Sequence, residues 1–180
     1  RDWSSDVCSS DLQKAEMIMM PQLVAGFHAM VGLAAVLVAL ARYYDLGSGE
    51  IMDSAHLAET MIGVFFGAVT LTGSIVACGK LHGNIPSKSL LLPFRHWINA
   101  AIIVASIALT YGFCISEQAS FSGSLYLWVE VAISLFLGWH LVMSIGGADM
   151  PVVVSMLNSY SGWTTVAAGF MLDNDLLIRS

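Results

Sequence analysis

Charged side chains are scarce in this sequence. Only 7 Lys and Arg and 13 Asp and Glu occur among 180 residues, which is 11% of the chain, whereas soluble domains carry about 25% charged residues. So few charges cannot cover a water-facing surface, and the 57% share of apolar residues indicates an exterior that faces lipid. The chain also lacks any basic run, so nothing in it predicts binding to nucleic acid.

Further absences narrow the possible functions. The three cysteines, Cys8, Cys78 and Cys114, show no regular spacing, which argues against a disulfide framework and against a metal site. No basic segment leads into a short apolar core with a small-residue cleavage site, so no secretory signal is expected. No nucleotide fingerprint such as GxGxxG occurs, so we expect neither cofactor-binding nor catalytic residues in this chain.

Five long apolar stretches dominate the sequence. Each is close to the roughly 20 residues that a helix needs to cross a hydrocarbon core of about 30 Å. They are continuously apolar rather than alternating, which favours helices over strands; a soluble helical core is the alternative, which five full-length spans disfavour. The sequence therefore predicts an all-α, polytopic transmembrane helical bundle with about five membrane-spanning helices, at Pro21–Ala41, Ala55–Gly79, Trp97–Ser116, Leu125–Ile145 and Val152–Leu172.

The two ends differ in composition from the rest. Residues 1–12, RDWSSDVCSSDL, are polar and unpatterned, and they resemble a translated sequencing adapter; a genuine solvated tail is the alternative. Residues 179–180 break an apolar run just as abruptly. We therefore expect residues 1–12 and 179–180 to be non-native and residues 13–178 to form the transmembrane part.

The connections predict the orientation in the membrane. The loop between the second and third apolar stretches carries Lys80, Lys88 and Arg95. Cytoplasmic loops are enriched in Lys and Arg. This loop, the start of the first apolar stretch and the short loop GGADMP should therefore face the cytoplasm.

Small and polar residues form one face on three of the predicted helices. They recur at intervals of three or four residues, which places them on one side of a helix. Membrane helices pack through small residues and bridge through polar ones, so we expect the three faces to meet. They comprise Ala25, His28, Gly32, Ala35 and Ala39; Glu59, Gly63, Gly67, Thr70 and Ser74; and Ser155, Asn158, Gly162, Thr165 and Gly169.

The rise of a helix predicts the depth of the polar members. At about 1.5 Å per residue, His28, Asn158 and Ser74 each lie about 9 to 10 Å from the cytoplasmic end of their helix, and Glu59 falls near the outer end. An imidazole ordinarily titrates close to neutral pH, and an amide or hydroxyl can bond either of its states. We interpret the set as a polar column for protons; hydrogen-bonded packing residues and an interfacial carboxylate are the alternatives. His140 lies at a similar depth without a comparable polar face.

Four segments resemble a known family. They are PQLVAGFHAMVGLAAVLVALA, GAVTLTGSIVACGKLHG, LLLPFRHWINA and the long, highly specific IGGADMPVVVSMLNSYSGW. They are similar to the beta subunit of proton-translocating NAD(P)+ transhydrogenase, from about Lys14 to Ile178. Residues 13–178 would then be a fragment of its transmembrane proton-channel domain, without the earlier beta-subunit helices, the last helix and the NADP(H) domain.

The resemblance implies an activity for the complete enzyme. This family, which is re/si-specific, couples hydride transfer from NADH to NADP+ to proton passage through the membrane domain. NAD(H) binds the alpha subunit and NADP(H) binds a C-terminal domain of the beta subunit, so both cofactors would lie outside this chain, which alone should be inactive. The implied partners are the alpha subunit, the rest of the beta subunit and the lipid bilayer, as a dimer of protomers in the bacterial inner membrane.

The resemblance also implies roles for single residues. His28 in LVAGFH matches the family's channel histidine, and Asn158 in SMLNSYSGW matches its companion asparagine. Ser74 in TGS and Glu59 in HLAE match further polar positions tied to the channel. Asp149 in GGADMP matches a cytoplasmic aspartate near the docking place of the NADP(H) domain. A multi-pass transporter or channel without an enzymatic role, and a purely structural subunit, are the alternatives.

Overall fold

The computed structural model describes residues 3–45, 54–86, 88, 94–115, 121–146 and 149–172, with the backbone alone for residues 3–19. The described backbone consists of α-helices and a few turn residues next to them, and it contains no strand. The prediction of an all-α bundle is therefore confirmed. The helices are α1 (Trp3–Asp45), α2 (Ser54–Leu81), α3 (Arg95–Ile115), α4 (Phe121–Met143) and α5 (Met150–Met171).

Four of the helices are long and apolar enough to cross a membrane. These segments are Met20–Tyr44 of α1, Ala55–Leu81 of α2, His96–Ile115 of α3 and Gly123–Met143 of α4. α5 has 22 residues, which is enough length for a span, but its Ser, Thr and Asn side chains make it more polar. The sequence predicts about five spans, and the described residues give four strongly apolar ones with a fifth, more polar helix packed against α1 and α2.

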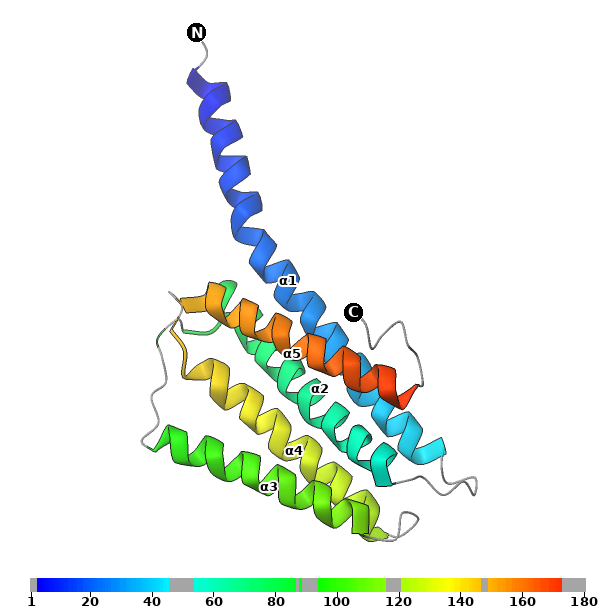
Figure 1. Ribbon diagram of the computed structural model, residues 1–180. Helices are drawn as coiled ribbons and strands as arrows, with labels where there is room; N and C mark the ends of the chain where they lie inside the picture. Colours follow the sequence, from blue (N-terminus) through cyan, green and yellow to red (C-terminus); the bar gives the residue numbers. More distant parts are fainter. Residues whose placement is uncertain are drawn as a thin grey trace.

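α1 begins much earlier than the apolar pattern predicts. The pattern places its start at Pro21, whereas the helical backbone begins at Trp3 and continues through that proline. A proline inside a helix removes one backbone hydrogen bond, yet the helix continues on both sides. The first part of α1 projects away from the bundle, and the other helices pack beside its second half (Figure 1). Whether residues 1–12 are native stays a prediction.

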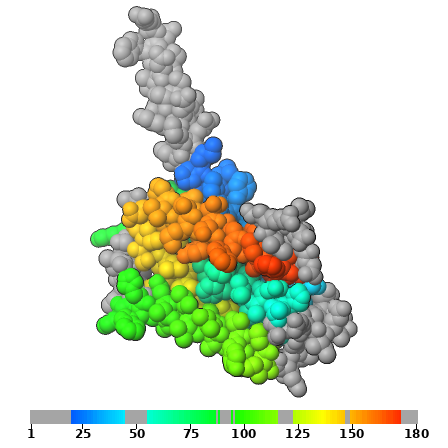
Figure 2. Space-filling view, viewed as in Figure 1, coloured from blue at the N-terminus to red at the C-terminus, as the bar shows by residue number. Residues whose placement is uncertain are grey.

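α2 lies at the centre of the bundle and α3 at its edge. α2 packs against each of the other four helices, and its span is 61% buried, whereas that of α3 is 11% buried. α3 lies outermost, beside α4 (Figure 1), and Figure 2 shows it along one border of the molecule. Its exposed apolar side chains, among them Trp97, Val104 and Ile107, suit a surface covered by lipid.

The first two helices pack closely through glycine. An ideal Cβ on Gly32 would lie 2.7 Å from the carbonyl oxygen of Gly67 and 2.7 Å from the backbone nitrogen of Leu71. The helices run antiparallel, because Gln22 Nε2 donates to the carbonyl oxygen of Leu81 at the far end of the same contact. The small-residue faces of α1 and α2 therefore meet as predicted. Their buried members are Ala25, Gly32, Ala35, Ala39, Gly63, Gly67, Thr70 and Ser74.

Two clusters of buried apolar side chains fill the bundle, one toward each end. The cluster beside the start of α2 contains Ala39, Leu57, Met61, Val64, Phe113, Leu127, Val131 and Met171. The cluster beside the end of α2 contains Ala25, Val76, Ala77, Val142, Met150, Val153 and Leu157. His28 lies one turn beyond Ala25 and Asn158 directly follows Leu157, so both polar residues lie at the level of the second cluster.

Candidate functional site

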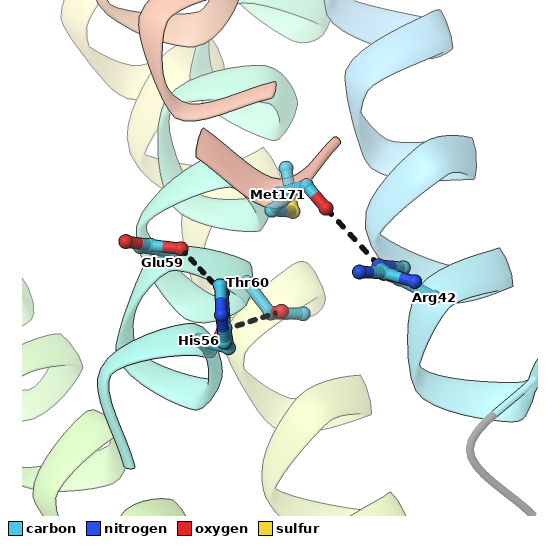
Figure 3. Close-up of polar contacts among 5 residues, drawn as sticks. All are labelled: Arg42, His56, Glu59, Thr60 and Met171. Atoms are coloured by element: carbon cyan, nitrogen blue, oxygen red, sulfur yellow. Dashed lines mark hydrogen bonds and ion pairs between the residues drawn. The ribbon is translucent and has the colours of Figure 1, made fainter. Parts of the chain in front are cut away.

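α5 runs parallel to α1 and antiparallel to α2. Arg42 Nε, in the last turn of α1, donates to the carbonyl oxygen of Met171, the last residue of α5, at 3.1 Å (Figure 3). On α2, an ideal Cβ on Gly73 would lie 3.0 Å from Leu157 Cδ2, near the middle of α5. These contacts fix the level of α5 relative to both neighbours, so that residues near 158 lie beside residues near 28 and 73.

His28 and Asn158 meet at this level. Nε2 of His28 lies 3.2 Å from Oδ1 of Asn158, and Nδ1 donates to the carbonyl oxygen of Val24, one turn earlier on α1, at 2.6 Å. The imidazole is half-buried and the amide is exposed on the described chain. The structure therefore joins α1 and α5 through the two residues that sequence analysis placed at one depth.

The two hydrogen-bond contacts of the imidazole are compatible with particular protonation states of the ring. Because both contacts are with oxygen acceptors, a ring protonated on both nitrogens can donate to Val24 O and to Asn158 Oδ1 at once. A neutral ring that keeps its Nδ1 proton would need a donor at Nε2, which the amide supplies if its NH₂ and oxygen exchange places. One rotation of the asparagine side chain thus lets it pair with either state of the ring.

Ser74 lies on α2 close to the same level but outside this pair. Gly32 contacts Leu71 and Gln22 bonds Leu81, so the antiparallel register places the turn around Ser74 beside the turn around His28. The Ser74 side chain is fully buried, and its Oγ has no hydrogen-bond partner among the described residues. Such a buried hydroxyl costs about 1–3 kcal/mol when left unpaired, so it is available to any polar group that enters between the helices.

Glu59 stands apart from these three residues. It lies in the second turn of α2, where its Oε2 accepts from His56 Nδ1 at 3.0 Å in a partly exposed ion pair (Figure 3). Its distance along the helix from Ser74 is about 22 Å at 1.5 Å per residue. Glu59 therefore lies at one end of the bundle and does not contact the His28 imidazole.

Asp149 lies at the opposite end of the bundle from Glu59. It directly precedes α5 as the N-cap residue, and its side chain makes no capping hydrogen bond. The residue is exposed, and the neighbouring Met150 is buried in the cluster beside the end of α2. The carboxylate is thus presented outward, next to a turn that the bundle anchors.

The predicted polar face of α5 does not point into the bundle as a whole. Ser155, Asn158 and Gly162 are exposed, and only Gly169 of the set is buried. The expectation that this face meets the other two is therefore wrong, apart from the Asn158 contact. The reason is that larger apolar side chains anchor α5 on α2: the buried residues of α5 include Val153, Leu157, Ala167 and Met171.

A buried carboxylate on α4 was not predicted from the sequence. Glu130 is completely buried; its Oε1 accepts from Ser106 Oγ of α3 at 2.7 Å and from Ser134 Oγ at 3.4 Å. The available signal was the pair Glu130 and Ser134, four residues apart on one face of an otherwise apolar helix. The signal on α3 was weaker, since a lone serine in an apolar run is common.

His140 and Lys80 are also more deeply placed than the sequence suggested. His140 is buried, and its Nδ1 lies 2.9 Å from Asn99 Oδ1 of α3, so it does share a polar contact. Lys80 is buried too, and its Nζ donates to three carbonyl oxygens around the end of α4, those of Val142, Met143 and Ile145. Among the described residues, no three His, Cys, Asp or Glu side chains lie together as a metal site would require.

Comparison with known proteins gives a consistent set of similarities. A family model described as NAD(P) transhydrogenase beta subunit matches residues 7–180. Two relatives from Rhodospirillum rubrum, both called NAD(P) transhydrogenase subunit beta, are 42% identical to this chain over 171 residues, which is 92% of the chain. The match covers 36% of each relative, so the chain spans little more than a third of their length.

Proposed function

The chain belongs to the NAD(P) transhydrogenase beta subunit family, and on that premise we propose that it forms part of a proton-conducting membrane domain. In the complete enzyme, proton passage through this domain is coupled to hydride transfer from NADH to NADP+, with re/si specificity. The family membership and the four apolar helices support this proposal. The observation that carries it is the His28–Asn158 pair.

The proposed domain has a location in the membrane and partner subunits. The domain lies in the bacterial inner membrane as a multi-pass bundle, which its apolar helices support. The relatives are named as a subunit, which supports an alpha subunit as partner. The rest of the beta subunit, with its NADP(H)-binding domain, completes the protomer, and two protomers associate as a dimer.

In this proposal His28 is the group that accepts and releases the proton. The imidazole can bind and release a proton at its ring nitrogens, and it lies within a helix that is apolar enough to cross the membrane. An ionisable side chain within a membrane span is costly, and such residues are typical of functional sites such as ion pathways and proton relays. The half-buried ring can exchange a proton with water without leaving its partners.

Asn158 supports both states of His28. With Oδ1 toward the ring, as the 3.2 Å contact has it, the amide accepts from the protonated imidazole. After release of the proton, rotation of the amide lets its NH₂ donate to the bare Nε2. Proton transfer therefore needs a side-chain rotation, which takes less motion than a change in helix packing. Redox-linked changes in the NADP(H) domain would decide which side of the membrane exchanges with the ring.

The other predicted site residues take secondary roles in the proposal. The unpaired Ser74 hydroxyl can hold a water or the proton acceptor beside the ring. Glu59, paired with His56, sits at the outer mouth, where it can exchange protons with the solution. The exposed Asp149, next to the start of α5, is where docking of the NADP(H) domain would reach the helix that carries Asn158.

The residues of this chain do not form a recognisable binding site for NAD(H) or NADP(H). The described residues are helices and short turns, and the sequence lacks a glycine-rich nucleotide fingerprint. We therefore place NAD(H) and NADP(H) in other domains of the complete enzyme, where they supply the hydride chemistry. What this chain contributes is the holding and moving of a proton at His28 Nε2.

Replacement of His28 by alanine in the complete enzyme tests the proposal. His28→Ala removes the titrating group, and we expect the proton-coupled transhydrogenation rate in membrane vesicles to fall by about 100-fold or more, the range typical for loss of a proton-transfer group. The measurement follows hydride transfer by nucleotide absorbance and proton uptake with a pH-sensitive dye in the same vesicles.

A matched control is His82→Ala, since His82 is exposed in the turn after α2. It should retain the coupled rate of the unaltered enzyme. Coupled activity in His28→Ala equal to that of His82→Ala would remove His28 from the proton path.

A further inference from the structure

A second ionisable group lies inside the bundle, away from the His28–Asn158 pair. Glu130 is 0% exposed. Both of its hydrogen bonds are to one oxygen, Oε1, which accepts from Ser106 and Ser134 hydroxyls. The other oxygen, Oε2, is buried and has no hydrogen-bond partner in the part of the chain that the structure describes. The two carboxyl oxygens therefore differ sharply in their surroundings.

No cation balances this carboxyl group within the described part of the chain. The one ion pair there joins His56 and Glu59, and the neighbours Leu127 and Val131 belong to an apolar cluster. The hydrophobic side chains packed against that cluster include Tyr43 from α1, Cys114 from α3 and Tyr126 from α4, and α2 contributes Leu57, Met61 and Val64.

The charged form of Glu130 would therefore be costly in this packing. A carboxylate needs several donors or a counter-ion when it is removed from water. Two hydroxyls on Oε1 leave Oε2 with nothing to offset a negative charge. A proton on Oε2 removes the charge and leaves Oε1 as the carbonyl-type acceptor that both serines already satisfy.

We propose that Glu130 is a second proton-binding site in the membrane domain, with its proton on Oε2, and that proton binding there is linked to the docking of α3 on α4. The link follows from the position of Ser106, which brings α3 against the carboxyl. Ionised Glu130 requires water at Oε2, and α3 is the least buried span in the bundle, so its separation is the route by which water can enter.

The sign of this link is fixed by thermodynamic reciprocity. The docked state binds the proton more tightly than the open state. Docking is therefore strongest at low pH and weakens as rising pH removes the proton. The contact between His140 and Asn99 holds the start of α3 on the end of α4, whereas Ser106 contacts Glu130 near the middle of both helices. Glu130 would bind this proton whether or not His28 carries protons.

Infrared spectroscopy of the complete enzyme in membranes tests the protonation state. At neutral pH, the difference between the unaltered enzyme and Glu130→Gln should contain the C=O stretch of a protonated carboxylic acid. Glu59→Gln is the matched control: its carboxylate is partly exposed and paired with His56, so its difference spectrum should show carboxylate bands instead. Carboxylate bands for Glu130 would overturn the proposal.

A second variant keeps the test decisive if Glu130→Gln fails to assemble. Ser106→Ala leaves the carboxyl in place and removes one donor to Oε1, so the C=O band should move to higher frequency. A band that does not move in this variant would contradict the assignment.

Hydrogen exchange tests the link to helix docking. The amides of α3 should exchange faster at high pH in the unaltered enzyme than in Glu130→Gln, and equally at low pH, because glutamine cannot ionise. The comparison at each pH cancels the intrinsic pH dependence of amide exchange. Equal exchange of α3 in both proteins at every pH would refute the link.

Discussion

Two cations at opposite ends of the bundle each bind the end of a helix. Lys80 Nζ donates to carbonyl oxygens at the end of α4, and Arg42 Nε donates to Met171 O at the end of α5. The last carbonyls of a helix lack intrahelical partners and carry partial negative charge. The few charged residues of this chain are thus used where they also fix helix positions, and the Arg42 contact helps to hold Asn158 opposite His28.

Asn158→Asp is the most informative substitution at the residue scale. A carboxylate next to the imidazole favours its charged form, and it cannot donate to the neutral ring as the amide can. We expect the coupled rate at neutral pH to fall about 10-fold or more. We also expect the pH of maximal rate to rise, because the added carboxylate keeps the proton on the ring at higher pH. A rate–pH profile of the complete enzyme in vesicles measures both effects.

The matched control for this profile is Ser159→Asp. It adds the same charge one residue further on α5, at an exposed position, without replacing the amide. It should leave the pH optimum in place. If the pH optimum of Asn158→Asp coincided with that of the control, the Asn158 amide would have no effect on proton binding by the His28 ring.

At the scale of helices, the close approach of α1 and α2 depends on glycine, which has no side chain. Gly32 lies against the backbone around Gly67 and Leu71, so there is no flexible side-chain end that could move aside. Membrane helices gain their association energy from such close packing, because lipid tails are as apolar as the side chains they replace. The approach also sets the distance between the turn of His28 and that of Ser74.

Gly32→Ala should therefore weaken the bundle. Its Cβ would lie 2.7 Å from two backbone atoms of α2, and relief of such overlap by shifting helices typically costs about 1–3 kcal/mol. The control is Gly26→Ala on the same helix, where a Cβ would have no atom within 4 Å. In thermal unfolding of the complete enzyme in detergent, the midpoint temperature should be lower for Gly32→Ala than for the unaltered enzyme. It should be unchanged for Gly26→Ala. Equal midpoints for both variants would mean that α1 and α2 do not depend on this contact.

The elements were predictable from sequence to different degrees. The apolar runs predict α2 to α5 to within a few residues, because span length is set by the bilayer, and small-residue spacing correctly predicts the α1–α2 contact. The prediction of which face of α5 is buried was wrong. Small polar residues and the larger Leu157 and Met171 lie on different faces of the helix, and only packing decides which face is buried. Glu130 was missed because its partner Ser106 is identified only once the rotation of α3 about its own axis is known.

At the scale of the whole molecule, the described contacts show which helix ends lie together at each of the two ends of the bundle. The Gln22–Leu81 and Lys80–Ile145 contacts gather one group, which also holds the start of α5. The Arg42–Met171 contact and the start of α2 mark the other. The predicted cytoplasmic segments, namely the Lys/Arg loop, the GGADMP loop and the inner end of α1, all fall in the first group. The bundle is therefore consistent with the single orientation that the positive-inside rule predicts.

Accessibility of single cysteines from each side of the membrane tests this orientation. Asn84→Cys lies in the exposed turn after α2, and Ala55→Cys lies at the exposed start of α2, so the two substitutions sit at opposite ends of one helix of about 40 Å. A membrane-impermeant maleimide should label Asn84→Cys only in inverted vesicles and Ala55→Cys only in intact cells, with the parent enzyme correcting for its native cysteines. The reverse pattern would invert the bundle, placing Glu59 rather than Asp149 on the cytoplasmic side. Asp149 could then no longer face a cytoplasmic NADP(H) domain, so this measurement also decides whether the proposed coupling through α5 is geometrically possible.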